Sequence, residues 1–168
     1  EKHGVRAATE NDIPAILVYL KRRVQDCLYM YIDIGKYGLE NPHMQVWFDA
    51  DNHGIKFVVM KYHDSISVYS ENDDWDAEAV IRLIQEQNVG SVTATKRVID
   101  RIYPFCSKHY EISYGWVFRF EKARDFEFQG NIEAANEADT EEIAQLIVQD
   151  EGIGGYYEVA DLADQLAE

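Results

Sequence analysis

The chain contains 168 residues, of which 46% are hydrophobic, so it can bury one good-sized core. Its formal net charge of −15 argues against binding to nucleic acid or to an anionic membrane surface, because both need clustered Lys and Arg. No window approaches the roughly 18 apolar residues that span a bilayer, and the histidines and cysteines show no metal-ligand spacing. We therefore expect a cytoplasmic protein without bound metal, in which Cys27 and Cys106 are reduced, buried thiols.

One short phrase occurs twice in the chain. Val5–Asp12 returns 127 positions later as Ile132–Asp139, with Ala, Ala, Glu and Asp at matching places, and Ile16 has its counterpart in Ile143. Each copy reads as a short strand, a polar cap and an amphipathic helix. A self-match at this spacing predicts two related domains. We expect a complete domain over residues 1–128, and over 129–168 the first strand and helices of a second, incomplete one.

The clearest predicted helix follows the first copy of this phrase. Thr9, with Asp12 three positions on, is typical of a helix cap, and the apolar residues behind it recur at helical spacing. We expect one continuous helix that breaks near Gly35 and Gly38. Its predicted buried stripe consists of Ile13, Ile16, Leu17, Leu20, Val24, Cys27, Leu28 and Tyr31.

Short strands and helices alternate in the rest of the first domain. Turn-like residues separate runs that are rich in β-branched and aromatic side chains, and Pro104 is expected to end the last helix. The predicted elements are strands 44–48, 55–63 and 66–69, a helix over 77–84, a strand over 91–95, a helix over 98–102, and strands 110–113 and 116–120. The order β-α-β-β-β-α-β-α-β-β predicts an α/β domain around a single sheet. Beyond a linker at 126–130 we expect the repeated strand, a helix on 143–147, a Gly-rich turn and a last helix over 159–166.

This element order, together with Arg6-Ala7-Ala8-Thr9-Glu10-Asn11-Asp12 and Ile16, resembles the GNAT superfamily of acetyl-CoA-dependent N-acetyltransferases. The resemblance covers 4–121 in topology, and 131–168 as the beginning of a second copy. It implies a mixed, mainly antiparallel sheet flanked by helices. In this family the coenzyme's pyrophosphate sits on backbone N–H groups where the fourth strand meets a helix, and a Gln/Arg-x-x-Gly-x-Gly/Ala loop shapes that cradle.

The first copy departs from this pattern. Between Tyr69 and Ala77 the chain reads Ser70-Glu71-Asn72-Asp73-Asp74-Trp75-Asp76, without a glycine or a cation. Its carboxylates would face a doubly charged pyrophosphate, at a cost of about 1 kcal/mol or more for each close contact, and they suit the helix dipole themselves. We therefore expect this fragment to bind no acetyl-CoA and to contain no cofactor-binding residue.

By the same resemblance, two places are candidates for substrate or catalytic residues. Glu151, Tyr156 and Tyr157 would border an acceptor-amine pocket, in which the acid attracts a cationic amine and the rings form an apolar wall. The alternative is a flexible turn between helices. Tyr103 is spaced like the family's catalytic Tyr, although Pro104 after it departs from the pattern, and a core or surface role is the alternative.

Two further patterns have a plainer alternative. Asp49-x-Asp51-x-His53-Gly54 resembles the start of a calcium loop, but Met60 replaces the expected Glu, and a hairpin turn is the favoured interpretation. Cys106 and His109 lie three apart like a nucleophile and its base. No orienting acid accompanies them, so a buried thiol beside a surface imidazole is favoured.

Taken together, these features predict part of a tandem N-acetyltransferase that moves an acetyl group from acetyl-CoA to a small-molecule or peptide amine. The parent protein would be the enzyme. The fragment itself would be inactive, and its first domain would serve as scaffold or as one wall of the acceptor pocket. The alternative is an acidic, non-enzymatic interaction module on the same fold. We also expect self-association or swapping, because an incomplete second domain exposes apolar faces.

Overall fold

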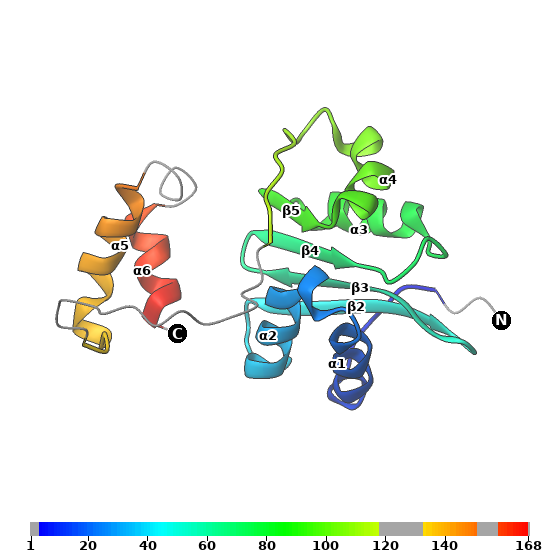
Figure 1. Ribbon diagram of the computed structural model, residues 1–168, viewed down its shortest axis with the longest axis horizontal. Helices are drawn as coiled ribbons and strands as arrows, with labels where there is room; N and C mark the ends of the chain where they lie inside the picture. Colours follow the sequence, from blue (N-terminus) through cyan, green and yellow to red (C-terminus); the bar gives the residue numbers. More distant parts are fainter. Residues whose placement is uncertain (1–3, 118–132, 151–157, 168) are drawn as a thin grey trace, which may run out of the picture. The chain divides into compact units, whose positions relative to one another are not determined.

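The computed structural model describes residues 4–117, 133–150 and 158–167. The chain divides into two compact units, residues 1–119 and 120–168, and each is described by itself. The elements of the first unit are β1 (Arg6–Ala7), the 3-10 turn η1 (Glu10–Asp12), α1 (Ile13–Lys21), the 3-10 turn η2 (Val24–Asp26), α2 (Leu28–Tyr37), β2 (Met44–Asp51), β3 (Gly54–Tyr62), β4 (Ser65–Tyr69), α3 (Ala77–Gln87), β5 (Ser91–Ala94) and α4 (Lys96–Cys106) (Figure 1).

The five strands form one sheet in the order β1-β2-β3-β4-β5. The first four are antiparallel neighbours, with Trp47 opposite Val59 and Met60 opposite Ser67. β5 runs parallel to β4, so a crossover is needed between them, and α3 supplies it. The predicted mixed, mainly antiparallel sheet flanked by helices is confirmed.

Helices cover both faces of this sheet, so β3 is buried on both sides. Val58 and Met60 point into a cluster with residues of α1 and α2, such as Ile16 and Leu20. Phe57 points the other way, into a cluster with residues of α3 and α4 (Figure 1). The alternation of side chains along a strand therefore divides the apolar residues of the meander between two cores.

The predicted continuous helix is wrong, because the structure divides it into α1 and α2. Cys27 leaves the helical conformation with φ −148° and ψ 34°, so the chain turns there and a new buried face begins. That face consists of Met30 and Ile34, whereas Leu28, predicted to be buried, is exposed. Gly35 lies inside α2, and only Gly38, with φ +60°, ends the helix.

Two predictions near the end of the first unit are also wrong. α4 continues past Pro104 to Cys106, since a proline in the last turn removes only one hydrogen bond of the helix. Residues 110–113 form no strand, and neither do Trp116 and Val117, while residues 118–120 of the predicted last strand lie outside the described residues. Strand propensity needs a neighbouring strand to be realised, and residues 111–117 are instead exposed in the described part of the chain. The remaining strands, α3 and the start of α4 lie where the sequence predicts them.

In the second unit the start of the first is repeated. Its elements are the 3-10 turn η3 (Glu137–Asp139), α5 (Thr140–Val148) and α6 (Val159–Ala167). η1 and α1 thus return as η3 and α5 with the same lengths, 127 positions later. No strand forms at 133–135, the described part of the predicted repeated strand, and the predicted linker at 126–130 lies outside the described residues.

Both copies start their helix with the same cap. In the first, the Asp12 carboxylate accepts hydrogen bonds from the Thr9 N–H and the Thr9 hydroxyl, each at 2.8 Å. In the second, the Asp139 carboxylate accepts from the Asn136 N–H at 2.9 Å and from its side-chain amide at 2.7 Å. The predicted cap is confirmed, and the sequence repeat is a repeat of local structure.

Candidate functional site

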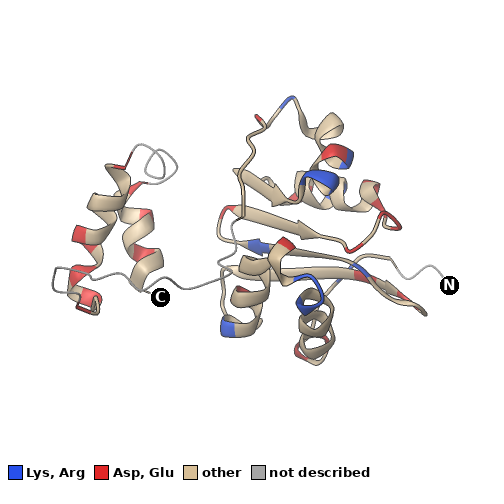
Figure 2. Cartoon of the chain, in the orientation of Figure 1, with Lys and Arg blue, Asp and Glu red and all other residues tan. Residues whose placement is uncertain are grey.

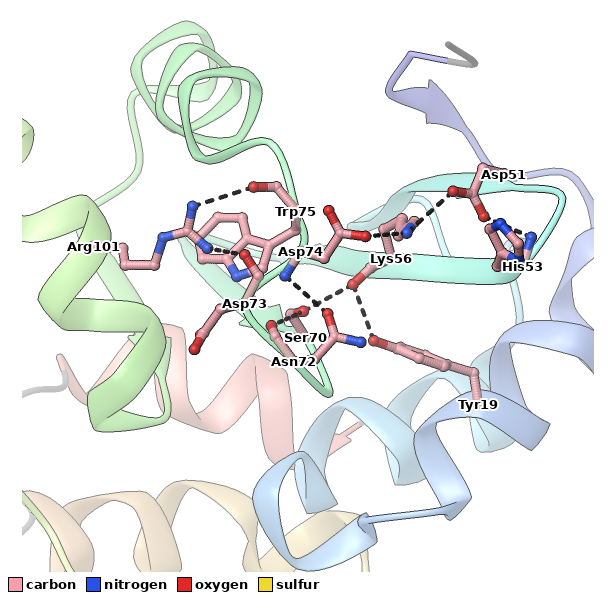
Figure 3. Close-up of polar contacts among 10 residues, drawn as sticks. All are labelled: Tyr19, Asp51, His53, Lys56, Ser70, Asn72, Asp73, Asp74, Trp75 and Arg101. Atoms are coloured by element: carbon pink, nitrogen blue, oxygen red, sulfur yellow. Dashed lines mark hydrogen bonds and ion pairs between the residues drawn. The ribbon is translucent and has the colours of Figure 1, made fainter. Parts of the chain in front are cut away.

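The site that the family resemblance points to is the loop between β4 and α3, residues 70–76, and its own side chains fill it. Trp75 is 7% exposed. Its ring meets Phe57 edge-on with centroids 6.1 Å apart. The guanidinium of Arg101 lies 4.3 Å from the centroid of the same ring (Figure 3). An aromatic ring in contact with an apolar neighbour and a cation is well packed. The Trp75 side chain is therefore part of the hydrophobic core.

Cations from two other elements surround the loop. Arg101 of α4 donates to the carbonyl oxygen of Asp73 at 2.6 Å and to that of Trp75 at 3.3 Å. Arg97, one turn earlier, forms an ion pair with the Asp73 carboxylate at 2.5 Å and donates to the Ser70 carbonyl oxygen. The acidic loop is thus compensated by side chains far away in sequence. Sequence reasoning missed this, because it counted cations only within the loop.

Lys56 of β3 compensates a further carboxylate of the loop, that of Asp74. Its ammonium group binds the Asp74 carboxylate and lies 3.1 Å from the carboxylate of Asp51 (Figure 3). The two acids, Asp74 foremost, raise the pKa of Lys56 above its ordinary value. Glu71 is paired as well, with Arg22 at 3.3 Å. Three of the four carboxylates in the loop therefore have a cationic partner.

Several backbone N–H groups in and after the loop donate to partners within the protein. The fourth carboxylate, that of Asp76, caps α3 by accepting from the Ala79 N–H at 3.0 Å. The Asp74 N–H donates to the side-chain oxygen of Asn72 at 2.9 Å, and the Glu71 N–H donates to the Tyr19 hydroxyl at 2.9 Å. The predicted cap at the start of α3 is confirmed, and these three N–H groups are not free to bind a phosphate.

Two buried hydroxyls anchor the start of the loop to β3. The Tyr19 hydroxyl donates to the Lys56 carbonyl oxygen at 3.1 Å, and the Ser70 hydroxyl lies 2.8 Å from the same oxygen (Figure 3). Ser70 also reaches the Asn72 carbonyl oxygen at 2.7 Å. Burial raises the pKa of Tyr19, so this group stays protonated at neutral pH and acts as a structural donor.

Of the predicted site residues, the described part of the chain includes only Tyr103, and it does not face this loop. Tyr103 lies on α4, but two positions after Arg101, which places it on a different side of the helix from the face that reaches the loop. Its side chain is half-buried, as a structural role would require. Glu151, Tyr156 and Tyr157 lie outside the described residues, and their assignment to an acceptor pocket stays a prediction.

The other two patterns follow their plainer interpretation. Asp51 and Gly54 face each other at the end of the β2–β3 hairpin, where the Asp51 carboxylate accepts from the His53 N–H at 2.7 Å. Cys106 is buried and His109 is exposed. Burial raises the pKa of the Cys106 thiol, the opposite of what a nucleophile needs. Across the described residues, no three acidic, His or Cys side chains gather as metal ligands would.

Comparisons with protein families, with characterised proteins and with solved structures found no match to this chain. The first unit is accordingly defined by its own architecture, an α/β fold with a five-stranded mixed sheet flanked by helices. Among the helices of the described residues, none has the length and apolar character needed to cross a bilayer.

Proposed function

We propose that residues 4–117 form a non-catalytic GNAT-like domain, which serves as scaffold or acceptor-pocket wall in a tandem N-acetyltransferase. The order β1-α1-α2-β2-β3-β4-α3-β5-α4 supports the resemblance. The recurrence of the cap and helix at 136–148 supports the beginning of a second domain of the same kind over 129–168. In the parent protein, the complete second domain would carry the transfer of acetyl from acetyl-CoA to an amine. Two buried free thiols suit a cytoplasmic protein.

The observation that carries the proposal is the occupied β4–α3 loop. A diphosphate bound there would need free N–H donors or cations, but three of the N–H groups serve Asp76, Asn72 and Tyr19, and the cations serve Asp73 and Asp74. Binding would have to break these contacts and displace the Trp75 ring. The loss of these contacts, and above all of the buried packing of Trp75, opposes it.

Titration of the 1–168 chain with acetyl-CoA in a calorimeter tests this proposal. We expect no stoichiometric binding with acetyl-CoA in excess at millimolar concentration. Arg97→Gln removes the cation that could turn toward a phosphate, and Tyr103→Phe is a matched control on the same helix that lies away from the loop. Stoichiometric binding to the unchanged chain that weakens in Arg97→Gln and persists in Tyr103→Phe would overturn the proposal.

A second candidate function is a non-enzymatic interaction module. It is favoured by one observation, the absence of Lys, Arg and His from the sequence after Arg124, which leaves the second unit strongly acidic. A protein surface with one sign of charge and exposed apolar groups suits a partner of opposite charge.

A further inference from the structure

One side of α5 presents an open apolar surface. Ile143, Leu146 and Ile147 follow the i, i+3, i+4 spacing that places them on the same side of a helix, and we name these three residues the α5 face. Leu146 is 69% exposed, and the other two are partly exposed. Ala144 of α5 and Leu162 of α6 are the residues buried in the described part of this unit. The helix pair therefore has its own small contact, while Ile143 and Ile147 are partly buried and Leu146 stays open.

The internal repeat shows what these positions do when they are covered. Counted back by 127 positions, the α5 face corresponds to Ile16, Tyr19 and Leu20 of α1. All three are buried in the core of the first unit, Ile16 and Leu20 completely. Since both helices begin with the same cap and have the same length, the α5 face keeps the apolar side chains of a buried surface.

The negative charge of the second unit limits which partners can cover the α5 face. From residue 133 to 168 the sequence has acidic side chains and no Lys, Arg or His. Glu142 is one turn before Leu146 on the same side of α5, and Asp161 and Asp164 are exposed on α6. Figure 2 shows acidic residues and no basic ones on α5 and α6. A second copy of this unit, or an anionic bilayer, would bring like charges together.

We propose that the α5 face is a docking site for a basic amphipathic helix of another protein. The three side chains form a ridge that can fit between the apolar side chains of a facing helix. Lys and Arg at the edges of that helix would lie against Glu142 and its acidic neighbours. This inference rests on the second candidate function, the interaction module, because in a complete second domain the sheet of that domain would cover the α5 face, as the sheet of the first unit covers Ile16 and Leu20. It does not depend on whether the β4–α3 loop binds a coenzyme, since it uses only residues of the second unit.

Two synthetic helical peptides of equal length, one of Leu and Lys and the other of Leu and Glu, serve as probes for the 1–168 chain. Fluorescence anisotropy of the labelled peptides measures binding at about 0.15 M salt, where exposed charges further apart than about 8 Å are screened. We expect the Leu/Lys peptide to bind and the Leu/Glu peptide not to bind. Leu146→Ser should weaken binding about tenfold or more, because it removes the most exposed apolar side chain of the site.

A matched control is needed because the whole chain is acidic. Val18 on α1 is 63% exposed, close to the value for Leu146, so Val18→Ser removes an equally open apolar group from the first unit. We expect Val18→Ser to leave the affinity unchanged, while circular dichroism verifies that both variants stay folded. Equal effects of the two substitutions, no effect of Leu146→Ser, or equal binding of both peptides would overturn the proposal. So would a dimer of the free chain in sedimentation that Leu146→Ser abolishes, because the occupant would then be a second copy.

Discussion

The rings of Tyr19 and Tyr69 pack against each other with centroids 5.4 Å apart and planes inclined by 59°, yet their hydroxyls differ. The Tyr19 hydroxyl donates to the Lys56 carbonyl oxygen and accepts from the Glu71 N–H. The Tyr69 hydroxyl is buried and has no hydrogen-bond partner among the described residues. Burial raises the pKa of both groups, so both remain neutral at ordinary pH.

This difference predicts opposite effects for two equivalent substitutions. Tyr19→Phe should lower the free energy of unfolding by about 1–3 kcal/mol, because it removes two hydrogen bonds and leaves the partly buried Glu71 N–H without its partner. Tyr69→Phe should be neutral or stabilising by about 1 kcal/mol, since it removes a buried hydroxyl without a partner. Urea unfolding followed by circular dichroism measures both values. A larger loss for Tyr69→Phe than for Tyr19→Phe would contradict this prediction.

The ion pair at the start of α1 makes stability depend on pH. Arg6 lies 2.6 Å from the Asp12 carboxylate, and this contact, with the Thr9 donors, holds the pKa of Asp12 well below its ordinary value. The folded state therefore binds a proton less readily than the unfolded state. The stabilisation from Asp12 is complete above the unfolded pKa of about 4 and is lost as the pH falls through the folded pKa.

Asp12→Asn should consequently lower the melting temperature at pH 6. The difference in melting temperature between this variant and the unchanged chain, the gap, should narrow steadily below about pH 4. Arg6→Gln is the matched variant, because it removes the largest cause of the pKa shift and keeps the carboxylate that accepts from Thr9. We expect it to show a smaller gap with the same trend. Melting curves between pH 2 and pH 7 provide the measurement, and a gap that widens on acidification would exclude this role for Asp12.

Gly35 and Gly38 should respond to alanine in opposite directions. Gly35 lies inside α2, and an added Cβ would be 3.9 Å from Leu17, an ordinary contact. Gly35→Ala should stabilise the protein by about 0.5–1 kcal/mol. Gly38 has φ +60° and ψ −155°, a conformation that is essentially restricted to glycine, so Gly38→Ala should cost about 1–3 kcal/mol. Thermal unfolding of the two variants checks the signs, and a shared sign would refute the assignment of the helix end.

The two thiols should be unreactive in the folded protein. Cys27 is buried, and desolvation, with a smaller contribution from Asp26, raises the pKa of its thiol to about 12. Little thiolate is then present at pH 8, and thiolate is the form that attacks a disulfide reagent. We expect Ellman's reagent to label neither Cys27 nor Cys106 within minutes in native buffer, and to label both in urea. One equivalent of fast labelling without urea would show that a thiol is accessible.

The parts of this fold that depend on residues close together in the sequence were predictable from it. The alternation from Met44 to Tyr69 predicts the meander, and the polar residues before Ile13 and Ala77 predict the helix starts. The division of the first helix at Cys27 was not predictable, because the apolar spacing continues through the turn. The absence of a strand at 110–113 was not predictable either, since strand propensity does not say whether a neighbouring strand is available for pairing.

The candidate site shows the same limit. The sequence of residues 70–76 predicts a helix cap and a lack of phosphate-binding glycines, and both hold. The hydrogen bonds from Arg97 and Arg101 to the loop depend on how α4 lies beside it. Their spacing of four places them on one face of a helix, which is the signal that could have been used. No local pattern says that this face meets the loop.

The single parallel contact of the sheet has a consequence for how the first unit folds. The two antiparallel pairs from β2 to β4 join neighbouring segments, whereas Ser65 meets Ser91 only after the whole of α3 has formed a crossover. Closing such a long loop carries an entropic penalty before any contact compensates for it. We therefore expect the hairpins to be present in the folding transition state and β5 to dock afterwards, so that weakening the contact between Val68 and Ala94 accelerates unfolding while leaving the refolding rate nearly unchanged.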